Sequence, residues 1–124
     1  MLVDRERGAG SAALEQLLRD EERAISVVTV SELLHGVHRA RGATRVKRHA
    51  FVEHVLAAFD AVPITEQVAR VHAEAWAGLA SRGAVIGAHD LWIAATALAH
   101  GFGIVTSDAR DFSRLTGLRV VEVT

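Results

Sequence analysis

Short runs of β-branched, almost wholly apolar residues recur along this chain, and longer stretches with helical periodicity separate them. The clearest runs are Ala24–Val30 (AISVVTV) and Gly103–Thr106 (GIVT). Such runs are typical of strands buried on both faces, because a strand with one solvated face alternates apolar and polar residues. Strands that alternate with helices indicate a parallel sheet covered by helices on both faces. We therefore predict an α/β fold.

The remaining predicted elements complete this alternation. Further strands are predicted at residues 60–64, where Pro63 suits a strand end, and at residues 119–123. Helices are predicted over 12–20, 44–59, 65–81 and 91–100, with a further turn within 107–113. One more helix is predicted to begin at a cap, Thr29 or Ser31, and to run toward residue 41, where Gly42 ends it. A chain of 124 residues suits one domain, so residues 1–124 are predicted to form a single domain.

Composition excludes several classes of protein. The chain has no cysteine, which excludes disulfides, zinc–thiolate sites, iron–sulfur clusters and cysteine nucleophiles. Its formal charge of −1 gives no global attraction to nucleic acid, so any such contact must come from a local patch or a metal. Residues 1–10 carry four charges before any apolar run, unlike a signal peptide, and the stretch Leu91–Ser107 is too short to span a membrane. We expect a cytoplasmic protein without membrane contact.

Carboxylates follow the predicted strands or open the next helix. They are Glu32, Asp90, Asp108 and Asp111. Functional groups of open α/β sheets collect at the carboxyl ends of strands, and acids that converge there repel each other unless a cation lies among them. Mg²⁺ and Mn²⁺ prefer such oxygen ligands and typically act on phosphate esters. The alternative is that each acid is an ordinary helix cap. We expect Glu32, Asp90 and either Asp108 or Asp111 to lie in one cleft, close enough to share a cation.

Three segments of the chain, in this order, resemble the PIN-domain ribonucleases, specifically toxins of the VapBC toxin–antitoxin type, and are similar to the FitB-like branch. The segments are VTVSELLHG, IGAHDLWIAATALAHG and IVTSDARDF. The resemblance runs from about Ala24 to the C-terminus. It implies a Mg²⁺- or Mn²⁺-dependent endoribonuclease that hydrolyses RNA phosphodiester bonds. It implies that Glu32, Asp90 and Asp108 bind the metal and that Asp111 joins them in catalysis. It also implies a homodimer and a cognate antitoxin protein as partner.

The sequence departs from the family pattern at its start. PIN domains begin with a strand that ends in Asp followed by Thr or Ser, whereas this chain offers MLVD followed by RERG. Asp4 is the only nominal candidate for that first acid, and its neighbours do not match. We therefore expect the first, central strand to be truncated and the activity of the chain to suffer. An inactive PIN-like binding module is the alternative. A metal-independent nucleotide-binding protein is disfavoured because no Gly-rich phosphate loop is present.

Residues 33–52 contain no acid. They contain five Lys and Arg residues and three histidines, namely Arg39, Arg41, Arg45, Lys47 and Arg48 with His35, His38 and His49. One interpretation is a patch that binds the RNA backbone. The other is a solvated helical face balanced by acids elsewhere, and basic helical faces are common.

Overall fold

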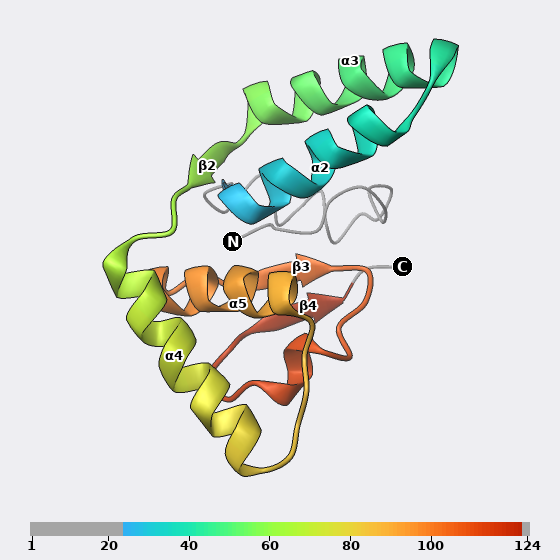
Figure 1. Cartoon of the computed structure of the whole chain (residues 1–124). Coiled ribbons are helices and arrows are strands. Elements are labelled where there is room, and N and C mark those ends of the chain that lie inside the picture. Colours follow the sequence, from blue (N-terminus) through green and yellow to red (C-terminus); the bar gives the residue numbers. More distant parts are fainter. Residues whose placement is uncertain (1–23, 123–124) are drawn as a thin grey trace.

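The computed structural model of the chain describes residues 24–122 (Figure 1). In chain order its elements are β1 (Ala24–Ser26), α2 (Val27–Arg39), α3 (Gly42–Ala58), β2 (Asp60–Val62), α4 (Glu66–Ser81), α5 (Ala88–His100), β3 (Ile104–Thr106), the 3-10 turn η1 (Phe112–Arg114) and β4 (Val120–Glu122). Within this range the predicted order of strands and helices is confirmed. The predicted helix at 12–20, the first strand and Asp4 lie outside the described residues.

The strands pair in parallel, as predicted. β1 pairs with β2, with Ala24 opposite Asp60, and β3 pairs with β4, with Ile104 opposite Val120. In the described part of the chain these are two separate pairs rather than one sheet. The pair β1–β2 lies at the base of the α2–α3 hairpin, with β1 before α2 and β2 after α3, whereas β3–β4 lies with α4 and α5 (Figure 1).

The strand predicted at residues 24–30 ends four residues early. Ser26 is the N-cap of α2, and its buried hydroxyl accepts a hydrogen bond from the Val28 amide at 3.0 Å. The predicted caps at Thr29 and Ser31 are therefore wrong, because both residues lie inside the helix. β-branched residues favour strands only weakly, and a capped first turn with tertiary packing outweighs that preference here.

The helix predicted to run toward residue 41 ends at Arg39, and Gly42 does not end it but begins α3. Gly42 has φ +57°, a conformation that glycine adopts without steric cost, so it suits the tight connection between α2 and α3. The two helices lie side by side as an antiparallel hairpin that projects from the rest of the molecule (Figure 1). Within α3 only Val52 and Val55, both in its second half, are buried.

The core of the molecule surrounds α5. Residues Ile93 to Ala97 of this helix are all buried, and β3 is buried along its whole length. Leu79 of α4, Ile104 of β3 and Phe112 of η1 pack in the same cluster. A helix that is apolar on nearly every side belongs in the interior, so α5 is fixed by neighbours on several sides. Gly101, with φ +71°, ends it directly after residue 100, where the predicted helix also ends.

None of the helices described between residues 24 and 122 is long and apolar enough to cross a membrane. The cytoplasmic location remains a prediction.

Candidate active site at the ends of the strands

Glu32 lies on the second turn of α2, which follows directly after β1. The helix starts at Val27 and has no acid in its first turn. The prediction that Glu32 opens this helix is therefore wrong by one turn. The early start keeps Glu32 near the carboxyl end of β1 without making it a cap, so its charge has no local role in ending or starting the helix.

Asp90 lies in the first turn of α5, as predicted. Gly87, the N-cap of this helix, provides no side chain to cap it. The Asp90 carboxylate lies nearby, because a Cβ atom built on Gly87 would be 3.8 Å from its Oδ2 atom. A negative charge in the first turn interacts favourably with the free amides and the helix dipole. Asp90 thus stabilises the start of α5 wherever else it acts.

A side-chain contact joins the segments that carry these two acids. The Nδ1 atom of His89 lies 3.2 Å from Oε2 of Glu32, across 57 residues of sequence. Both side chains are partly exposed. Because His89 directly precedes Asp90, this contact brings the first turn of α5 to the Glu32 side of α2. Nothing in the sequence pattern identifies Glu32 as the partner of His89.

Asp108 and Asp111 lie in the loop after β3, and local contacts hold each of them. The Asp108 amide donates to the Thr106 hydroxyl at 3.1 Å, and Asp108 Oδ1 accepts from the Arg110 amide at 3.3 Å. Asp111 forms an ion pair with Arg114 at 3.3 Å. These contacts are typical of side chains that shape a turn. They fix the loop after β3 with one carboxylate at each end.

The expected metal site is not assembled by the described side chains alone. Among residues 24–122, no three His, Asp or Glu side chains form a group that could hold a metal ion. The donor chemistry still suits Mg²⁺, since the site residues supply carboxylate oxygens. Asp4, the nominal first acid, lies outside the described residues. The shared cation therefore remains a prediction.

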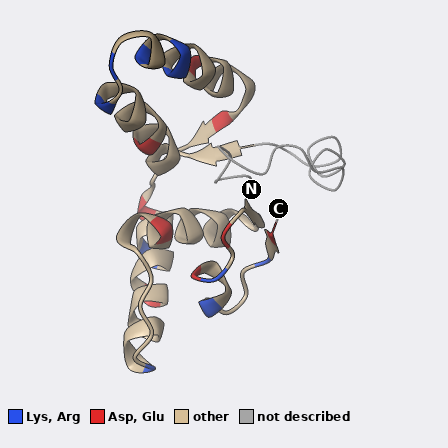
Figure 2. Cartoon of the chain, turned by 90° about the vertical axis from the view of Figure 1, so that its right-hand side faces the viewer, with Lys and Arg blue, Asp and Glu red and all other residues tan. Residues whose placement is uncertain are grey.

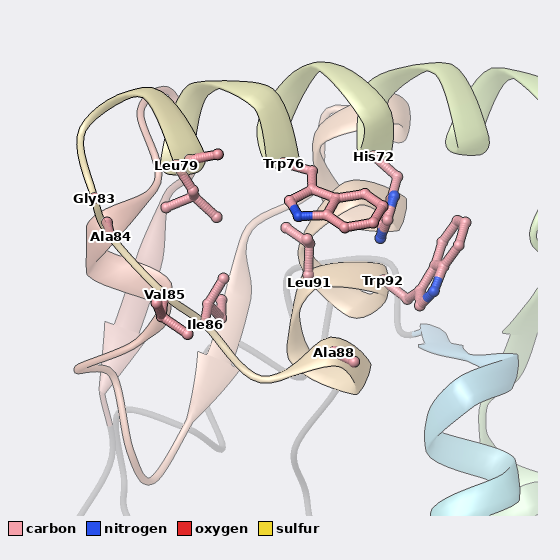
Figure 3. A pocket seen from close by; sticks show the side chains of 11 residues that line it. His72, Trp76, Leu79, Gly83, Ala84, Val85, Ile86, Ala88, Leu91 and Trp92 are labelled. Carbon is pink, nitrogen blue, oxygen red and sulfur yellow. The ribbon is translucent and has the colours of Figure 1, made fainter.

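An apolar pocket of about 570 Å³ lies between α4 and the start of α5 (Figure 3). Trp92 stacks on His72 with ring centroids 3.6 Å apart, and the edge of Trp76 approaches the same imidazole at 5.8 Å. Burial lowers the pKa of His72 below its ordinary value of 6.5. Trp92 shares a helical face with two other lining residues, Ala88 and Leu91, whereas helical periodicity directs residue 90 to the opposite side. The pocket therefore does not present the candidate acids.

Comparison with known proteins gives consistent results. The family described as "PIN domain" matches residues 2–118. "Ribonuclease VapC1" of Rickettsia felis is 34% identical over 115 residues, covering 92% of this chain and 86% of that protein. "Ribonuclease VapC5" of Mycobacterium tuberculosis is 35% identical over 111 residues, covering 89% and 81%.

Solved structures agree in fold. VapBC-5 of M. tuberculosis, a member of the VapBC family of toxin–antitoxin systems, is 31% identical with a TM-score of 0.81, covering 98% of this chain and 97% of that one. VapBC2 of R. felis, solved bound to a DNA fragment from its promoter, has a TM-score of 0.87 at 20% identity, covering 99% and 98%. The second likeness concerns the fold alone.

Proposed function

This chain belongs to the PIN domain family, and on that premise we propose that it is a metal-dependent endoribonuclease, the toxin of a toxin–antitoxin pair. Its reaction is hydrolysis of RNA phosphodiester bonds at the acidic edge formed by α2, α5 and the loop after β3. The observation that carries the proposal is the contact between His89 and Glu32, in a chain similar to proteins named ribonucleases. It brings the acid of α2 to the acid-bearing turn of α5.

Each residue of the acidic edge has a proposed role that follows from its position. Glu32 and Asp90 would hold Mg²⁺ or Mn²⁺ from two helices, and Asp108 would add a carboxylate from the loop after β3. The bound cation would neutralise charge on the phosphodiester and acidify a water molecule. His89 is a positioning residue, because its ring contacts Glu32 and limits the rotamers of that carboxylate. Asp111 acts from the far end of the same loop, where Arg114 orients it.

Cleavage of a labelled RNA tests this proposal. The full chain should cut within the strand when Mg²⁺ or Mn²⁺ is present and stop when EDTA removes it. Asp90→Asn and Glu32→Gln should each slow the reaction by about a hundredfold or more, as loss of a ligand or an electrostatic stabiliser does. The matched control is Glu74→Gln, which removes an exposed carboxylate on α4. Equal cleavage by all three variants, or cleavage unaffected by EDTA, would contradict the proposal. RNA binding without cleavage would favour the inactive binding module.

A protein partner is also part of the proposal. The relatives of known structure include toxin–antitoxin complexes, so we expect an antitoxin to bind this chain and block the acidic edge. Separately, we expect a homodimer that covers the rim of the apolar pocket. Trp76 and Val85 lie on that rim, and their side chains are 62% and 75% exposed, which is unusual for large apolar residues. Sedimentation velocity should show a dimer that Trp76→Glu dissociates and Gln67→Glu, on the opposite side of α4, does not. A monomeric parent chain would refute it.

A further inference from the structure

The hairpin of α2 and α3 concentrates the positive charge of this protein. Residues 33–52 hold five Lys and Arg residues and no acid. The rest of the chain holds nine Lys and Arg against fifteen Asp and Glu, so it carries a formal charge of −6. Figure 2 shows the blue segments gathered toward the connected ends of the two helices. A weakly anionic protein thus presents one strongly cationic projection.

The cations of this hairpin are exposed and lack anionic partners. Every side chain from residue 41 to residue 51 is exposed. In the part of the chain that the structure describes, none of the five Lys and Arg residues forms an ion pair with a carboxylate. A helical face that is charged for solubility alone usually alternates cations with acids three or four residues away. This face has no such acids, so the cations stay available to an external anion.

Four arginines lie where α2 and α3 are connected and in the first turns of α3, and we call them the basic ridge: Arg39, Arg41, Arg45 and Arg48. Arg45 and Arg48 are three residues apart and share one face of α3, Arg41 is the N-cap of this helix, and Arg39 is the last residue of α2. Two contacts join this face to α2: Arg45 Nη2 lies 3.3 Å from His38 Nδ1, and Arg48 Nη1 donates to the Gly36 carbonyl at 3.4 Å. Each guanidinium has five N–H donors, so one such contact orients it and leaves the others free for phosphate.

The basic ridge leads to the candidate active site. Glu32, His35 and Arg39 are separated by three and four residues and therefore line one face of α2. Gly36, the acceptor for Arg48, is one helical turn from Glu32. A strand of RNA cut at the acidic edge could thus continue along the hairpin, with its phosphates next to the guanidinium groups.

We infer that the basic ridge binds the phosphate backbone of the RNA substrate and holds the strand while the acidic edge cleaves it. This inference rests on the proposed function and adds the surface that binds the substrate. Acidic metal ligands repel a polyanion, so a site of this kind gains from cations placed to one side. Contacts of this type recognise phosphates rather than bases, so the ridge contributes affinity and register without sequence preference.

Binding of a labelled single-stranded RNA, measured in EDTA so that no cleavage occurs, tests the inference. The parent chain is compared with Arg45→Gln/Arg48→Gln and with Lys47→Gln/Arg70→Gln. Both double variants lose two positive charges, but Lys47 lies on the other side of α3 and Arg70 lies on α4. Two lost phosphate contacts should lower the slope of log K against log salt by about 1.4. They should weaken binding by about 25-fold at 0.1 M salt. The control pair should behave like the parent chain.

The outcomes separate this inference from the function on which it rests. If both double variants weaken RNA binding equally, net charge rather than the ridge is responsible and the inference fails. If neither weakens it, the inference fails as well, and reduced binding of a poly-glutamate probe by the ridge variant would then assign the surface to an acidic protein. If the parent chain binds RNA through the ridge but never cleaves it with Mn²⁺, the proposed hydrolysis fails and the ridge stands. With cleavage, the ridge variant should raise KM and leave kcat unchanged.

Discussion

Replacing Ser26 with alanine should destabilise the protein by removing the cap that starts α2. The Ser26 hydroxyl is fully buried and accepts the hydrogen bond from the Val28 amide at 3.0 Å. Losing such a cap costs about 1 kcal/mol, within a range of about 0.5–2 kcal/mol. For a chain of 124 residues this corresponds to a fall in Tm of about 4 °C. Thermal unfolding followed by circular dichroism measures it.

Ser31→Ala is the matched control for this prediction. Ser31 is exposed and lies in the interior of α2, where alanine is the better helix former, so this variant should keep or slightly raise the Tm. Both variants replace a serine with alanine, so each removes one hydroxyl group, at positions five residues apart. A Tm that falls more for Ser31→Ala than for Ser26→Ala would refute the reasoning and return the start of the helix to the place that the sequence pattern favours.

Two further predictions concern stability. Gly103→Ala should lower the Tm, because the added Cβ atom would lie 2.7 Å from Nε and 3.2 Å from the carbonyl oxygen of Arg119. Gly78→Ala, within α4, meets no such contact and should raise the Tm. A higher Tm for Gly103→Ala than for Gly78→Ala would contradict the packing described. Burial lowers the pKa of His72, so the folded state favours the neutral imidazole. The unfolded chain takes up this proton more readily, so the free energy of unfolding should fall as the pH drops from 6.5 toward the lowered pKa of the folded state. His72→Phe should reduce that acid loss of Tm, and an unchanged pH dependence would show that His72 does not cause it.

Local signals in the sequence identified most of the elements. Thr65 caps α4 through the Val68 amide and Gly101 ends α5 in the left-handed conformation, as expected from residue type and position. The run AISVVTV misled because its β-branched residues fit a strand, and nothing local shows that the Ser26 hydroxyl will be buried against the Val28 amide. Tertiary packing decides whether Ser26 or Ser31 caps α2, and a short sequence pattern does not contain that information.

The sequence indicates which acidic residues are candidates for the site, but not how they are arranged in space. The sequence singled out acids after strands and at helix starts, and their role in a shared site remains a prediction; what the structure shows is that His89, next to Asp90, contacts Glu32. The contact of His89 with Glu32 spans 57 residues and depends on how α5 docks against α2, so periodicity cannot reveal it. The turn contacts of Asp108 depend on the backbone path after β3, where the sequence predicted only a turn within 107–113.

Direct titration of the full chain with Mn²⁺ tests the central claim that Glu32 and Asp90 share one cation. Calorimetry or the spin-resonance signal of free Mn²⁺ gives the affinity. Glu32→Gln and Asp90→Asn should each weaken binding by about tenfold or more, while Glu74→Gln should not. The double variant should lose less than the sum of the two single losses in binding free energy, as for residues that act on one ion. Parent-like Mn²⁺ affinity in both single variants would contradict the account.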